Sequence, residues 1–149
     1  MRYKTWTLDG GCETLEVRPV PWWWNLVSRA SFTFEPVIYL QRTAWADIEN
    51  SARLIQHEHI HLERQKGRRW RWLWNYIRHK SFRAKEEVLA YAHEYLWVEP
   101  SLRAAWLDEV STRLASGFYY WCISKQDAEQ QIKAKAKDLA ARYGLYFAD

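Results

Sequence analysis

The hydrophobic pattern changes its period near Thr43, and this change limits the folds open to the chain. Before that point, residues 3–8 and 14–20 alternate between apolar and polar side chains, which is typical of short strands. Asp9-Gly10-Gly11 between them has the composition of a hairpin turn. After Thr43, apolar residues recur at steps of three and four, as on one face of an α-helix. The pattern therefore predicts an α+β fold, in which a small N-terminal antiparallel sheet is followed by a mainly helical body.

Five helices are predicted in this body, because glycine, proline and capping residues interrupt the helical pattern. Their ranges are 43–67, 70–78, 81–98, 101–114 and 124–144. Before them, Phe32 to Leu40 alternates with Pro36 inside, which predicts an edge strand or a bulge. No repeat or linker separates these elements, so one domain is expected over residues 1–149.

The amino-acid composition limits which partners the chain can bind and which residues can hold a metal. Eleven Trp and nine Tyr raise the aromatic share to 17%, which predicts a core that reaches the surface or a surface that binds a partner. The net charge of +4 permits an acidic partner without requiring one. Cys12 and Cys122 form neither a Cys-x-x-Cys zinc motif nor a disulfide framework, so a metal must be held by histidine and carboxylate ligands. No stretch approaches the ~18 apolar residues of a membrane span, and the start lacks a secretory signal, so a cytoplasmic protein is expected.

Residues 57–61 contain a His-Glu-x-x-His motif within the first predicted helix. His57 and His61 lie about one turn apart, so both imidazoles can reach one tetrahedral zinc ion. Glu58 lies about 100° around the helix from His57, where it can take a proton from water and later deliver it to a leaving amine. With His57 at 0°, the apolar stripe spans about 140° to 240° and His61 lies at about 40°. The pair is therefore expected to face away from the stripe, towards a cleft.

The middle histidine of the motif has a different expected role. His59 lies at about 200°, in the centre of the apolar stripe, where it cannot share a metal with the other two histidines. It is predicted to be a core residue, or a residue that orients a ligand, rather than a ligand itself.

The motif, followed by a glutamate on a later helix, resembles the gluzincin class of zincin metallopeptidases. In that class the glutamate often begins a Glu-x-x-Ala pattern, which Glu87-Val88-Leu89-Ala90 matches 26 residues after His61. The resemblance covers about Thr43 to Trp97 and departs at Tyr91, where an aspartate is common in some members. It implies a zincin-like fold and Glu87 as the third zinc ligand.

Other residues compete for the place of the third ligand. Glu94 lies seven residues after Glu87 and faces the same way, so it could bind the metal or orient a ligand. His93 and His79 are further candidates. The plainer alternative is that Glu86, Glu87 and Glu94 only solvate the outer face of a helix.

The resemblance implies two more parts of a site. Zincins often use a Tyr or His outside the motif to stabilise the oxyanion, and Tyr91, on the face of Glu87, is favoured over Tyr119 and Tyr120. Zincins usually also keep an edge strand before the metal helix that binds substrate backbone. Phe32 to Leu40 stands in that place.

The segment from Arg68 to Trp74 interleaves cations with large rings. Such a segment can bind nucleic acid or lie at a membrane interface. Burial is the favoured interpretation, since one helical face carries four large apolar residues while the arginines remain in solvent. These four are Trp70, Leu73, Trp74 and Ile77. For Trp22-Trp23-Trp24 two interpretations stay open, core packing and an adhesive loop.

Taken together, the residues predict a zinc-dependent metallopeptidase that hydrolyses peptide or protein substrates, with Glu58 as general base and acid. The alternative is a zincin-like structural or interaction protein, in which the metal site is not catalytic and the Trp-rich surface binds a protein partner. Nucleic-acid binding is the least favoured function.

Overall fold

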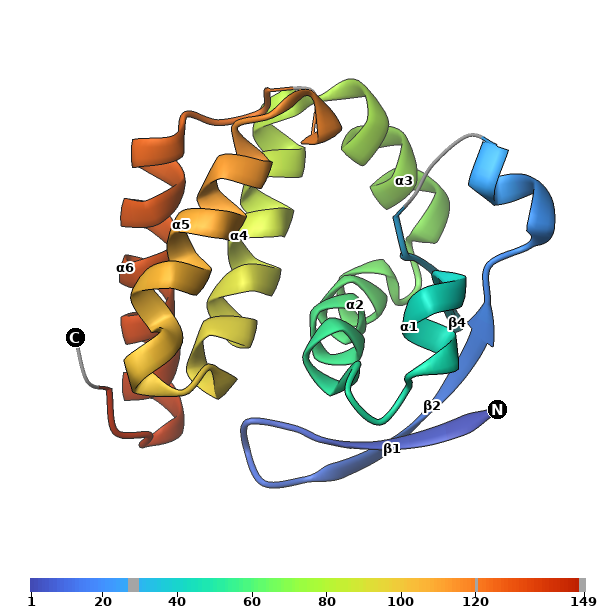
Figure 1. Ribbon diagram of the computed structural model, residues 1–149, viewed down its shortest axis with the longest axis horizontal. Coiled ribbons are helices and arrows are strands. Elements are labelled where there is room, and N and C mark those ends of the chain that lie inside the picture. The colour runs from blue at the N-terminus through green and yellow to red at the C-terminus, as the bar shows by residue number, and fades with distance from the viewer. Residues whose placement is uncertain (27–29, 120, 148–149) are drawn as a thin grey trace. The chain divides into compact units, whose positions relative to one another are not determined.

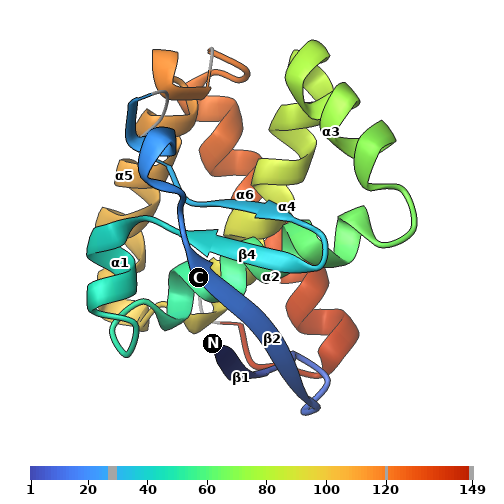
Figure 2. The same ribbon diagram turned by 90° about the vertical axis from the view of Figure 1, so that its right-hand side faces the viewer.

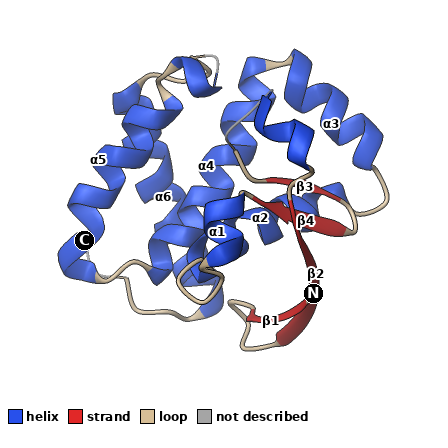
Figure 3. Cartoon of the chain, turned by 45° about the vertical axis from the view of Figure 1, so that its right-hand side comes forward, coloured by secondary structure: helices blue, strands red, loops and turns tan. Residues whose placement is uncertain are grey.

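A computed structural model describes residues 1–26, 30–119 and 121–147, and its elements are coloured along the chain in Figure 1. The chain forms two compact units, Met1–Trp70 and Arg71–Asp149. Among the described residues, the strands all belong to the first unit, and helices make up the second (Figure 3). The predicted α+β class, with a small sheet before a mainly helical body, is therefore confirmed. The expectation of one domain over 1–149 stays a prediction.

The sheet of the first unit has four strands in the order β1-β2-β4-β3. β1 (Arg2–Trp6) and β2 (Cys12–Pro19) form the predicted antiparallel hairpin, in which Gly10 has a φ of +83° that favours glycine. β2 pairs in parallel with β4 (Val37–Leu40), as Figure 2 shows. The sheet is thus mixed and not wholly antiparallel. The reason is that β3 (Phe32–Phe34) intervenes and pairs antiparallel with β4 at the edge, which turns β4 to run in the direction of β2.

The proline inside the predicted strand 32–40 divides it into two strands. Glu35 and Pro36 form the turn between β3 and β4, so Pro36 lies in neither strand. Proline lacks the N–H that a ladder position needs, which makes a turn the compatible place for it. The expected edge strand therefore consists of only three residues, Phe32–Phe34.

The first predicted helix, residues 43–67, is also divided, into α1 (Arg42–Ala46) and α2 (Ala52–Gln65). The Ser51 hydroxyl donates to the carbonyl oxygens of Ala44 and Asp47, at 3.0 and 2.9 Å. Such local side-chain bonds compete with the helical ladder and end α1. α2 then packs on the sheet through a shared core of apolar side chains. This core comprises Leu15, Val17, Ile38, Leu40, Ile55 and Leu62.

The second unit is built on α4 (Lys80–Trp97), α5 (Arg103–Leu114) and α6 (Lys125–Tyr143), which pack side by side (Figure 1). Short 3-10 turns at Pro100–Leu102 and Gly117–Tyr119 flank α5. The predicted bounds 124–144 of α6 are its two caps, since Ser124 Oγ accepts from the Asp127 amide at 3.1 Å and Gly144 has a φ of +65°. Their common core buries small and branched side chains from all three helices. It includes Val88, Ala92, Tyr95, Leu107, Val110, Leu114, Ala128, Ile132 and Leu139.

Helix α3 (Arg69–Arg78), which spans the junction of the two units, exposes three of the four apolar residues that are predicted to be buried, and the fourth, Leu73, is half-buried. Trp70, Trp74 and Ile77 are 67%, 59% and 62% exposed. Trp72 is buried instead: its ring stacks on Tyr76 with centroids 4.8 Å apart and meets the edge of Phe82 at 6.0 Å. We call Trp70, Trp74 and Ile77 the exposed stripe of α3.

The Trp-rich segment 22–24 lies in a 3-10 helix, Trp22–Leu26. Trp22 and Trp23 are exposed, whereas the half-buried Trp24 packs against Phe32. Its indole N–H donates to the Ala30 carbonyl at 3.0 Å. One of the three tryptophans therefore contributes to packing and two lie at the surface. Across the described residues, no helix is both long and apolar enough to cross a membrane.

Candidate metal centre

The two outer histidines of the motif lie on α2 and turn their Nε2 atoms to one point. His57 Nε2 and His61 Nε2 are 3.2 Å apart, and the ring centroids are 5.0 Å apart at an interplanar angle of 77°. Two zinc–nitrogen bonds of about 2.0–2.1 Å at a tetrahedral angle would place the nitrogens about 3.3 Å apart. The observed separation therefore fits two neighbouring ligands of one tetrahedral ion.

Both histidines of this pair are buried. Ile55 and Leu62 anchor the helix in the core of the first unit, and His57 and His61 are only 4% and 5% exposed. Burying two imidazoles is unfavourable unless their nitrogen atoms are satisfied. The convergence of two imidazole nitrogens on one point is compatible with a histidine-bound metal.

Glu58, the predicted acid/base, is also buried and is held by the edge strand. Its Oε2 accepts from the Thr33 hydroxyl at 2.7 Å, and the same hydroxyl lies 3.0 Å from the Glu58 carbonyl oxygen. One hydroxyl proton bridges the side chain and the backbone of Glu58, which limits the rotamers open to the carboxylate. Thr33 therefore positions Glu58, a role that no sequence motif marks.

The edge of β3 is covered by side chains of the first unit. Gln65 donates from Nε2 to the Thr33 carbonyl at 2.9 Å and accepts at Oε1 from the Glu35 amide at 3.0 Å. Arg69 Nη1 donates to the Glu35 carbonyl at 3.0 Å. These bonds satisfy the edge much as a neighbouring strand would. The implied binding of substrate backbone at Phe32 to Leu40 thus has to compete with Gln65 and Arg69.

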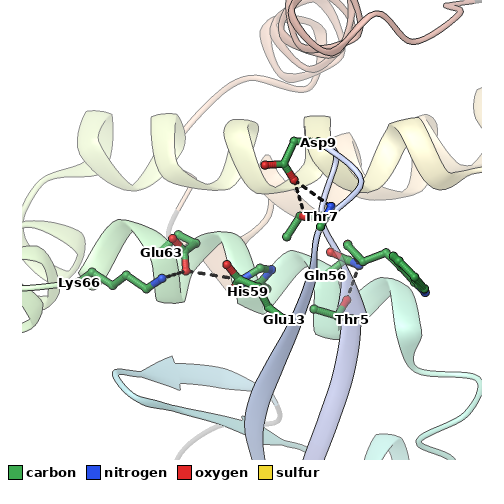
Figure 4. A network of polar contacts seen from close by, with 10 residues as sticks. Thr5, Thr7, Asp9, Glu13, Gln56, His59, Glu63 and Lys66 are labelled. Carbon is green, nitrogen blue, oxygen red and sulfur yellow. Dashed lines mark hydrogen bonds and ion pairs between the residues drawn. The ribbon is translucent and has the colours of Figure 1, made fainter.

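His59 points to another face of α2, towards the β1–β2 hairpin (Figure 4). Its Nε2 lies 2.9 Å from Glu13 Oε2 and 3.5 Å from Glu63 Oε1. Lys66 pairs in turn with Glu63. One residue before the motif, Gln56 Nε2 donates to the Trp6 carbonyl at 2.7 Å. This polar network fastens α2 to the hairpin and accounts for a buried histidine that does not face His57 and His61.

In the second unit, Glu87 lies on α4 in a group of tyrosines. It is 1% exposed, and its Oε1 accepts from the Tyr76 hydroxyl at 2.5 Å. The Tyr91 and Tyr119 hydroxyls lie 3.0 Å apart. Burial raises the pKa of Tyr91 above its usual range, and the nearby Glu87 carboxylate raises it further. The pKa of Tyr119 is raised by the same two causes, so both phenols remain protonated hydrogen-bond donors. Tyr120 lies outside the described residues.

The neighbouring acidic residues of α4 have indole partners. Trp72 Nε1 donates to Glu86 Oε2 at 3.1 Å, and Trp106 Nε1 donates to Glu94 Oε1 at 3.3 Å. Glu86 and Glu87 are both buried, so the plain alternative of a solvated acidic face does not hold for this pair. One oxygen of each carboxylate is therefore bonded to an indole N–H.

The histidine pair and Glu58 belong to the first unit, whereas Glu87 and Tyr91 belong to the second. The roles of Glu87 as third ligand and of Tyr91 as oxyanion donor stay predictions, as do the competing roles of Glu94, His93 and His79. His93 is half-buried on α4, and His79 is exposed immediately before it. No family model, curated protein or solved structure matches the chain.

Proposed function

We propose that this chain is a zinc-dependent metallopeptidase in which His57 and His61 bind the metal. The observation that supports the proposal is the 3.2 Å separation of the two Nε2 atoms, buried on a helix that also carries Glu58. Imidazole nitrogen is a preferred ligand of zinc, and two such ligands leave room for a third protein ligand and a water. Zinc, when bound, polarises a carbonyl group and lowers the pKa of water.

The third ligand in this proposal is Glu87. Its support is the match of residues 87–90 to the Glu-x-x-Ala pattern, together with a buried carboxylate whose Oε1 is fixed by Tyr76. A carboxylate that is held by a hydrogen bond presents its oxygen atoms in a defined direction, as metal ligands do. Glu94 is the weaker candidate, because its carboxylate is half-buried and bonded to the Trp106 indole.

Glu58 is the residue that moves protons in the proposed reaction. It takes a proton from the attacking water as the new carbon–oxygen bond forms, and gives a proton to the amine nitrogen as the carbon–nitrogen bond breaks. The hydroxyl of Thr33 holds the carboxylate through both steps. Tyr91, with a phenol kept protonated by its raised pKa, is proposed to donate to the developing oxyanion.

One observation favours the alternative, a zincin-like structural or interaction protein with a metal site that is not catalytic. Gln65 and Arg69 bond the backbone groups of the edge strand at Thr33 and Glu35. A peptide that adds to this edge as a further strand must displace them. Cleavage therefore requires either that displacement or a substrate bound without strand pairing. The cytoplasmic location stays a prediction in both cases.

The test is a Glu58→Gln variant of the full chain, purified without added zinc. We expect about one zinc per chain by elemental analysis, and cleavage of a peptide library by the natural chain. Glu58→Gln should keep the zinc and lose at least about 100-fold in cleavage rate, because general acid–base catalysis contributes that much. Glu63→Gln, on the exposed side of the same helix, is the matched control and should retain activity. A natural chain that binds zinc tightly and cleaves nothing would support the alternative.

A further inference from the structure

The exposed stripe of α3 lies on one side of one helix. Trp70, Trp74 and Ile77 are spaced by four and three residues, which places them within about 60° of each other around the axis. Each is more than half exposed. Three large apolar side chains in one contiguous patch are uncommon on a soluble surface and indicate a binding face.

Basic residues are concentrated in this part of the sequence and along one border of the stripe. From Arg64 to Lys80 the chain carries seven Lys or Arg residues and no Asp or Glu. Arg71 and Arg78 are exposed and lie about 80° to 100° around α3 from Trp70, along one border of the stripe. The Arg78 guanidinium lies 4.8 Å from the Trp74 ring centroid. The surface is therefore apolar at its centre and positively charged at its rim.

We propose that the exposed stripe of α3 binds the surface of an anionic lipid membrane without crossing it. Tryptophan prefers the headgroup region of a bilayer, and the aliphatic side chain of Ile77 can enter the boundary with the acyl chains. Arg71 and Arg78 then pair with lipid phosphates beside the inserted stripe. An apolar centre with a cationic rim fits an anionic bilayer surface in both respects.

Two other occupants fit this surface less well. A single-stranded nucleic acid would match the charge, but Ile77 offers no ring for a base and the Trp74 ring already carries Arg78. A second copy of the chain would match the apolar stripe, but it would bring two basic segments together, and residues 64–80 of neither copy supply a carboxylate. An anionic membrane offers an apolar layer for the stripe and phosphate groups for the arginines.

The experiment is flotation of the full chain with vesicles of phosphatidylcholine alone and with vesicles that also contain phosphatidylserine. We expect binding to the anionic vesicles only, weakening as salt rises because the charges are screened. Trp74→Ser with Ile77→Ser should weaken it at least about tenfold, since the inserted apolar groups are lost. Trp6→Ser, an equally exposed tryptophan in β1, is the matched control and should bind as the natural chain does.

The charge is tested by a second pair of variants. Arg71→Gln with Arg78→Gln should weaken binding about 30-fold, from the contribution of each basic residue near an anionic surface. Lys133→Gln with Lys137→Gln, both exposed on α6, removes the same net charge elsewhere and should have little effect. All of these residues lie outside the motif and Glu87, so zinc content should be unchanged in each variant. Failure of this proposal is thereby distinguishable from failure of the peptidase proposal.

Several results would overturn the membrane proposal. Equal binding to neutral and anionic vesicles would remove the role of the basic rim, as would equal effects of the two charge variants. Absence of vesicle binding would reject the proposal outright. Binding of single-stranded RNA that is lost in Trp74→Ser with Ile77→Ser, without vesicle binding, would assign the surface to nucleic acid. A dimer in sedimentation that the same variant dissociates would assign it to a second copy.

Discussion

Helices α2 and α3 both depart from the usual rule that apolar side chains are buried and polar ones exposed, and they do so in opposite ways. On α2 the polar side chains of the motif are buried, and each of His57, Glu58 and His61 is less than a tenth exposed. On α3 the large apolar side chains of the exposed stripe lie at the surface. Burying polar groups and exposing apolar ones both reduce the stability of a folded chain.

The difference between the two helices lies in what compensates each departure. On α2 the first unit supplies a bond from Thr33 to Glu58 and a 3.2 Å approach of the two imidazole Nε2 atoms. On α3 the stripe has partial cover, from Phe34 beside Trp70 and from Arg78 beside Trp74, and all three of its side chains stay more than half exposed, as a binding face would be. Sites that break a local folding rule are where function is expected. The comparison is therefore in keeping with the two proposals, a metal bound at α2 and a membrane surface bound by α3.

The largest expected effect tests whether the buried polar face of α2 is a metal site. His57→Ala and His61→Ala should each remove the zinc, because the two remaining protein ligands rarely hold the ion. Elemental analysis of purified variants is the measurement. His59→Ala is the control on the other face of α2, and it should keep the zinc while losing about 1–3 kcal/mol of unfolding free energy, since Glu13 loses its partner. Full zinc content in His57→Ala or in His61→Ala would contradict the proposal that the buried polar face of α2 binds a metal.

The next effect tests whether the two faces of α3 differ as the structure indicates. Trp72→Ala should lower the unfolding free energy by about 3–5 kcal/mol, as for a buried tryptophan. It also leaves Glu86 without the indole donor at 3.1 Å. Trp74→Ala should change the unfolding free energy by no more than about 0.5 kcal/mol, because its ring is mostly exposed. Urea denaturation measures both. Similar losses in the two variants would mean that the exposed stripe is packed after all.

Local patterns predicted much of this architecture. The β1–β2 hairpin, the caps of α6 and the placing of the motif on a helix follow from turn residues, capping residues and spacing, which act within a few positions. The parallel pairing of β2 with β4 depends on segments about twenty residues apart, and no local signal specifies it. The break at 47–51 depends on how one serine side chain, Ser51, bonds.

For the candidate site, too, only the residues that are close in sequence could be predicted. The motif residues follow from spacing on one helix, but Thr33, Gln65 and Tyr76 act through tertiary contacts that no pattern marks. The exposed stripe of α3 was assigned to the interior because hydrophobicity alone cannot say which apolar helical face is covered. Its basic neighbours were the available signal that the face is at the surface.

The smallest expected effect concerns the inner side of α3, where Tyr76 donates to Glu87. Tyr76→Phe removes one hydroxyl and leaves the ring that stacks on Trp72. If Glu87 binds zinc, the loss of the bond that orients its carboxylate should weaken zinc binding about 10- to 100-fold, as when a partner of a metal ligand is removed. Competition with a chromophoric zinc chelator measures the affinity.

The matched control for Tyr76→Phe acts on the competing carboxylate of α4. Trp106→Phe removes the indole donor to Glu94 and keeps an aromatic ring in the core of the second unit. Zinc affinity should be unchanged in this variant, because the proposed ligand is Glu87. A loss of affinity in Trp106→Phe, with none in Tyr76→Phe, would move the third ligand to Glu94 and leave the histidine pair in place. Each substitution deletes one hydrogen-bond donor to one carboxylate. The zinc affinities of the two variants therefore identify which glutamate of α4 binds the metal. Whether the histidines of α2 bind it is a separate test.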